Sequence, residues 1–87
     1  MQRSQRYILT YWDLFTIREG APCGAESEVA ILDGGVEIDR MKFAGKYQGE
    51  EGYRRAYTGR PGLTAELALG PGRIQFAAED LDVTLEA

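Results

Sequence analysis

The sequence predicts a small all-β domain, an antiparallel sandwich or barrel of about six short strands. Apolar and polar residues alternate with a period of two in several segments, as they do where one face of a strand is buried. Turns rich in glycine and proline separate these segments at intervals of roughly 8–12 residues. Valine, isoleucine, threonine and aromatic residues, which favour strands, are concentrated in the same segments.

The most distinctive local signal is a hairpin that turns at Asp33-Gly34-Gly35. Glycine adopts without steric cost the positive φ angles that a tight hairpin turn needs. Strands are predicted on either side, at residues 29–32 and 36–43. In the second strand the apolar phase slips by one residue at Asp39-Arg40, which predicts a β-bulge there.

The N-terminal part is predicted to contain one long central strand. Residues 1–5 are polar and predict a flexible arm. Residues 6–18 are apolar on both sides and predict a strand that is bulged near Trp12-Asp13, with a helix as the alternative. Glycine and proline within residues 19–25 predict a loop.

The C-terminal half is predicted to add further strands. A polar connection at residues 45–52 leads into a strand at 52–58, for which a short helix over 50–57 is the alternative. A turn at 59–62 leads to a half-buried strand at 63–69.

After a turn at residues 70–72 a return strand begins with Ile74 and Phe76, and residues 81–86 alternate most cleanly of all. The side chains predicted to form the core are Leu9, Val29, Ile31, Val36, Ile38, Leu67, Phe76, Val83 and Leu85.

Length and composition predict one globular domain. The chain has 87 residues, of which 44% are hydrophobic and 28% charged, and such proportions argue against disorder. The longest apolar-rich stretch, residues 7–17, is too short and too polar for a membrane span or a signal peptide. Cys23 is the only cysteine, so no intrachain disulfide can form. We expect a soluble cytoplasmic protein.

The residues available for chemistry argue against an enzyme. The chain has no histidine, which removes the commonest general base and the commonest zinc ligand. A single cysteine excludes a cysteine-rich metal site within one chain. Three pairs of acids spaced two apart would lie on one side of a strand, and we interpret them as solvated sheet faces: Glu26/Glu28, Glu37/Asp39 and Asp80/Asp82. We expect no metal, no cofactor and no catalytic residue.

One cluster suggests a contact surface. Residues 53–60 contain three arginines and no acid in a chain of net charge −4. The candidate partner-binding residues are Tyr53, Arg54, Arg55, Tyr57 and Arg60. Tyrosine and arginine are typical of protein hot spots, and they can also stack bases and neutralise phosphates. The structural alternative is that the tyrosines cover the edge of the core while the arginines pair with Glu50 and Glu51.

The sequence therefore predicts a non-enzymatic interaction protein whose partner is another macromolecule, with a protein favoured over nucleic acid because the net charge is negative. Its size and acidity are similar to those of phage or mobile-element inhibitors of bacterial defence complexes and of virion assembly proteins, which is an analogy only. The alternatives are a nucleic-acid-binding β-barrel that uses residues 53–60 and an acidic nucleic-acid mimic. Exposed strand edges can pair with a second copy of the chain, so a homodimer is a further alternative.

Overall fold

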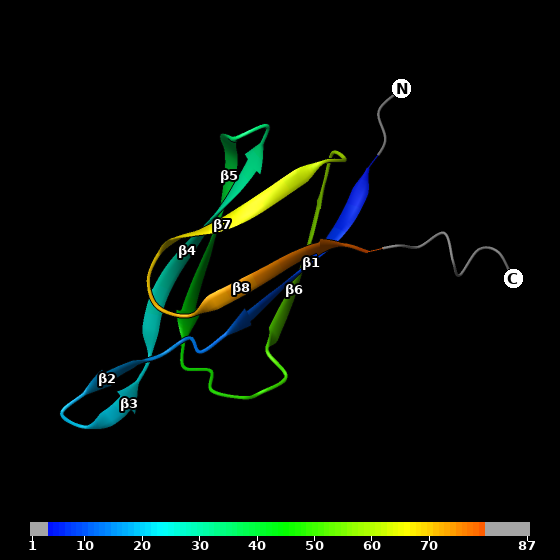
Figure 1. Ribbon diagram of the computed structural model, residues 1–87. Coiled ribbons are helices and arrows are strands. Elements are labelled where there is room, and N and C mark those ends of the chain that lie inside the picture. Colours follow the sequence, from blue (N-terminus) through cyan, green and yellow to red (C-terminus); the bar gives the residue numbers. More distant parts are fainter. Residues whose placement is uncertain (1–3, 80–87) are drawn as a thin grey trace, which may run out of the picture.

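The computed structural model describes residues 4–79 and is all-β, which confirms the predicted fold class (Figure 1). This range contains no helix, so the alternative helices at residues 6–18 and 50–57 are wrong. The strands are β1 (Gln5–Trp12), β2 (Thr16–Arg18), β3 (Ala21–Cys23), β4 (Ala25–Asp33), β5 (Val36–Gly45), β6 (Tyr53–Gly59), β7 (Leu63–Leu69) and β8 (Arg73–Ala78).

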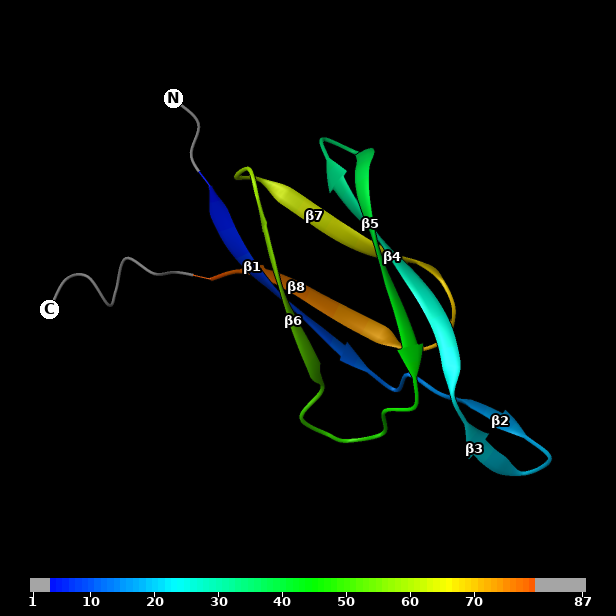
Figure 2. The same ribbon diagram turned by 180° about the vertical axis from the view of Figure 1, so that it is seen from behind.

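The strands form three antiparallel sheets. The first has the order β6-β1-β8 and the second the order β5-β4-β7, while β2 and β3 pair only with each other among the described residues. The two larger sheets lie face to face as a small sandwich, and the β2–β3 hairpin projects beyond one end of it (Figures 1 and 2). The six longer strands correspond to the predicted number.

The core lies between the two larger sheets. Alternate residues of the central strands β1 and β4 point into it, as the period of two requires. The buried apolar side chains that form the core cluster are Tyr7, Leu9, Tyr11, Leu14, Val29, Ile31, Met41, Phe43 and Leu63. Both tyrosines also use their hydroxyl groups: Tyr7 donates to the carbonyl oxygen of Arg60, and Tyr11 donates to that of Pro71. The core side of β1 thereby holds two turns in place.

The predicted hairpin is present between β4 and β5. Gly34 and Gly35 have φ angles of 62° and 88° and form a two-residue turn. A bulge occurs in β5, but earlier than predicted: Ile31 pairs with Asp39 and Leu32 with Glu37, which leaves Ile38 as the extra residue.

The position of this bulge corrects the predicted core. Met41 and Phe43 point into the sandwich, whereas Val36 is 66% exposed and Ile38 is also exposed, so their assignment to the core is wrong. Leu9, Val29 and Ile31 are fully buried, as predicted, and Leu67 and Phe76 are half-buried against the core. Val83 and Leu85, and with them the predicted strand at 81–86, lie outside the described residues.

The predicted long strand at residues 6–18 is wrong, because the chain breaks at Asp13. This residue has a φ angle of 62°, which ends β1 and turns the chain away from the first sheet. Leu14 then makes an isolated bridge to Tyr47, with N···O distances of 3.0 and 2.8 Å.

Two shorter predictions near the N-terminus also need correction. The predicted loop at residues 19–25 contains a tight turn at Glu19-Gly20 between β2 and β3, and β4 already begins at its end. Gln5 pairs with Gly59 in the first sheet and so does not belong to an arm.

Gly52 lies where the loop after β5 packs closely against β1. Its φ angle is +85°, and a Cβ atom there would overlap the Thr10 side chain and lie 2.9 Å from Nε1 of Trp12. Gly35 has a similar φ angle of +88°, but a Cβ atom there would meet no neighbour within 4 Å among the described residues.

We expect Gly35→Ala to cost about 1–2 kcal/mol, because only the backbone conformation is strained. Gly52→Ala should cost a further ~1–3 kcal/mol, because the methyl group also overpacks the site. Chemical denaturation of both variants measures the difference. Equal losses would contradict close packing of this loop on Thr10 and Trp12.

Candidate macromolecule-binding face

The predicted cluster at residues 53–60 lies on β6 and on the turn that follows it, and strand alternation divides it between two sides. Tyr53, Arg55 and Tyr57 lie opposite Tyr11, Leu9 and Tyr7 of β1, whose side chains are in the core. These three therefore share the side that faces β5. Arg54 points to the opposite, outer side of the first sheet.

Arg55 connects the two sheets. Its guanidinium carbon lies 4.1 Å from the centroid of the Phe43 ring and 5.7 Å from that of the Tyr53 ring. Its Nη1 donates a hydrogen bond of 3.2 Å to the carbonyl oxygen of Lys42. The cation–π contacts and the hydrogen bond hold β6 against β5, so Arg55 has a structural role.

Tyr57 and Arg60 also have partners within the chain. The Tyr57 hydroxyl donates to a carboxylate oxygen of Asp39 at 2.9 Å, and Arg60 forms an ion pair of 2.9 Å with Asp33. Burial, followed by the hydrogen bond to Asp39, raises the pKa of Tyr57. Within residues 4–79 the pairing expected with Glu50 and Glu51 is absent, and Asp33 takes that role for Arg60.

Arg54 instead belongs to a surface that the sequence did not indicate as a unit. We call it the basic face: the outer side of the first sheet, formed by the residues of β6, β1 and β8 that point away from the core. It consists of Arg6, Ile8, Thr10, Trp12, Arg54, Ala56, Thr58, Arg73, Gln75 and Ala77. Thr10 lies between Arg54 and Gln75, and Trp12 lies beside Arg73.

The arginines of the basic face are only partly neutralised. Arg6 forms an ion pair of 2.7 Å with Glu79, and Arg73 lies 3.4 Å from a carboxylate oxygen of Asp13. Within residues 4–79 no carboxylate pairs with Arg54. The face therefore carries an excess of positive charge on a protein of net charge −4.

Trp12 forms the aromatic part of this face. The guanidinium carbon of Arg73 lies 4.7 Å from the centroid of its ring. Its Nε1 donates a hydrogen bond of 3.1 Å to the carbonyl oxygen of Glu50. This bond fixes the half-buried indole ring beside β1. The combination of a fixed indole with two exposed arginines is typical of protein contact sites.

The outer side of the second sheet has the opposite character. Arg40 donates to Glu28 at 2.8 Å and to Glu37 at 2.7 and 2.8 Å. These hydrogen bonds raise the pKa of Arg40 and lower that of Glu37. Glu26 and Glu66 add negative charge, while Lys42 and Arg40 interrupt it, so the acidic surface is not continuous.

The described residues give no sign of a metal centre or of a membrane helix. Within residues 4–79 no three His, Cys, Asp or Glu side chains gather as metal ligands would. The same range holds no helix that could cross a bilayer. Cys23 is a free, half-buried thiol at the end of β3.

Comparison of the chain with protein-family models, with curated proteins and with solved structures gives no match. The chemistry of the basic face is therefore inferred from its own residues.

The different roles of two adjacent arginines can be tested by truncation. Arg55→Ala removes the contacts with Phe43 and with the Lys42 carbonyl oxygen, and we expect a loss of about 1 kcal/mol in the free energy of unfolding. Arg54→Ala is the matched control and should change stability by less than about 0.5 kcal/mol. Thermal melts of the two variants measure this, and equal melting temperatures would contradict the structural role of Arg55.

Tyr57 should ionise at higher pH than an exposed tyrosine, because its pKa is raised. A raised folded-state pKa contributes stability that is complete below the unfolded value of about 10 and is lost as the pH rises through the folded value. Ultraviolet titration of tyrosinate, with Tyr57→Phe to identify the signal, measures the shift. Asp39→Asn should lower this pKa, and an unchanged titration of that variant would contradict the assigned contact.

Proposed function

We propose that this protein is a non-enzymatic interaction protein that binds an acidic surface of another protein through its basic face. The observation that carries the proposal is the pair Arg54 and Arg73 on either side of β1, next to the fixed ring of Trp12. Neighbouring strands are about 4.8 Å apart, so the two arginines bracket a strip roughly 10 Å wide. Within residues 4–79 Arg54 has no carboxylate partner and Arg73 is only partly neutralised by Asp13, so positive charge remains on a protein that is acidic as a whole.

A protein partner is favoured over nucleic acid for two reasons. Binding to phosphates gains affinity from counterion release, which increases with the number of phosphates that the protein neutralises. On the basic face, two of the three arginines already have an acidic neighbour, Glu79 or Asp13. Arginine with tryptophan, by contrast, is the composition most enriched at protein hot spots.

This proposal replaces the larger contact surface expected from residues 53–60. Four of the original five make contacts within the chain, so only Arg54 is kept as a principal contact; the four are Tyr53, Arg55, Tyr57 and Arg60. Inhibition of a bacterial defence complex would follow from this mode of binding if the target needs the acidic surface for its own function. A virion assembly protein would use the same face to join an acidic subunit.

The experiment compares single charge reversals on the basic face and outside it. Arg54→Glu should weaken capture of a host-cell protein at least about tenfold, because like charges then meet in the interface. Lys46→Glu makes the same charge change at an exposed residue in the loop after β5 and should leave capture unchanged. Quantitative pull-down with mass spectrometry, after nuclease treatment of the extract, measures both, and melts confirm that both variants fold.

Two results would overturn the proposal. One is equal capture by wild type and Arg54→Glu. The other is binding of the wild type to a labelled dT oligonucleotide with a steep salt dependence, which would support the nucleic-acid alternative.

A further inference from the structure

The β2–β3 hairpin stands apart from the rest of the molecule. Within the described residues its two strands are hydrogen-bonded only to each other, and it projects beyond the end of the sandwich (Figures 1 and 2). A two-stranded hairpin is only marginally stable in water without packing against another element. We call residues 16–23 the arm.

The arm exposes an apolar side. Ile17 is 56% exposed and lies directly opposite the exposed Pro22 in the hairpin register. Arg18 and Glu19 lie at its tip and are also exposed. The arm therefore combines an apolar side with an acidic residue at its turn.

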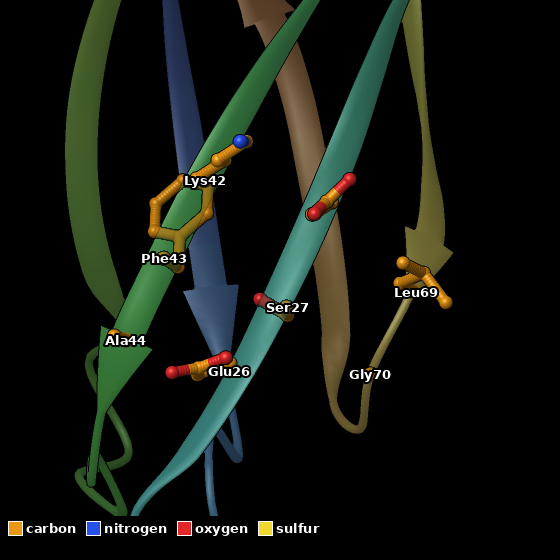
Figure 3. Close-up of a pocket in the computed structure, with 8 residues that line it drawn as sticks. Glu26, Ser27, Lys42, Phe43, Ala44, Leu69 and Gly70 are labelled. Atoms are coloured by element: carbon orange, nitrogen blue, oxygen red, sulfur yellow. The ribbon is translucent and has the colours of Figure 1, made fainter.

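A matching hollow lies next to the base of the arm, on the outer side of the second sheet. It has a volume of about 430 Å³ and brings together Lys42 from β5, Glu26 from β4 and Leu69 from the end of β7 (Figure 3). Leu69 is 57% exposed there. A cleft of about 530 Å³ between the arm and the sheet, which Thr16 and Arg18 line from the arm, shares Glu26 and Ala44 with the hollow, so the two are adjacent.

We propose that the arm of one molecule occupies the hollow of a second copy of this chain, and that the exchange is reciprocal. Ile17 and Pro22 would cover Leu69, which is exposed in the single chain. The charges are complementary, because Glu19 at the exposed turn of the arm meets Lys42 of the hollow. Within residues 4–79 Lys42 has no ion pair of its own.

Symmetry supports a closed dimer. Because the arm and the hollow lie at the same end of the sandwich, a two-fold axis at that end lets both arms bind at once. Two equivalent contacts then form together, and neither hollow is left open for a third copy. Each arm gains the packing surface that an isolated hairpin lacks.

Light scattering coupled to size-exclusion chromatography tests the proposal on the full chain at micromolar concentrations. The wild type should be a dimer, and Ile17→Glu should raise its dissociation constant at least about tenfold. Val36→Glu is the matched control, because Val36 is equally apolar and 66% exposed, but lies on β5 at the turn of the β4–β5 hairpin. It should leave the dimer intact.

Charge reversal and cross-linking identify the two contacting surfaces. Glu19→Lys should weaken the dimer, and Lys42→Glu added to it should restore the dimer. In a Cys23→Ser background, chains carrying Ile17→Cys should form a disulfide with chains carrying Leu69→Cys when the two are mixed. Neither chain alone should cross-link efficiently.

Three results would overturn the proposal: a monomeric wild type at these concentrations, a dimer that Ile17→Glu does not weaken, or no mixed disulfide. Arg54→Glu lies on the other sheet and should not alter the dimer. Loss of partner capture and loss of the dimer are therefore separable.

Discussion

The structure depends on the hydroxyl groups of two buried tyrosines in β1. Tyr7 accepts a hydrogen bond of 3.1 Å from the Leu63 backbone N–H and donates to the Arg60 carbonyl oxygen at 2.7 Å, which fixes the turn between β6 and β7. Tyr11 binds the Pro71 carbonyl oxygen in the turn between β7 and β8. At both turns the chain passes from one sheet to the other. A single central strand thus supplies hydrogen-bond partners for backbone groups at both crossings. Polar groups that are buried without such partners would cost stability.

The same strand also determines what the protein displays. Because successive side chains of a strand point to opposite sides, burial of Tyr7 and Tyr11 places Thr10 and Trp12 on the outer side. Trp12 is then held by the loop that contains Glu50, and Gly52 is the residue that lets this loop approach β1. The geometry of the basic face is therefore a consequence of core packing and requires no separate scaffold.

The sequence predicted those features that depend on local chemistry. The turn at Gly34-Gly35 follows from the positive φ angles of adjacent glycines, and the side that Arg55 occupies follows from alternation. It did not predict the exact position of features that depend on the partner strand. The bulge at Ile38 is set by the register between β4 and β5, and a shift of this kind exposes Val36. Near Asp13 the sequence predicted a bulge and not a break, because a left-handed conformation is uncommon for any residue other than glycine.

The candidate site shows the same limit most clearly. A run of arginines in sequence suggested one surface, but Arg54 and Arg55 differ by one position and therefore point to opposite sides of β6. Arg55 joins the two sheets. The neighbours of Arg54 are Thr10, Trp12 and Arg73, which are distant from it in the sequence. A contact surface on a sheet is assembled across strands and not along one. In this protein the strand order β6-β1-β8, which no local pattern encodes, turns dispersed arginines into one basic face.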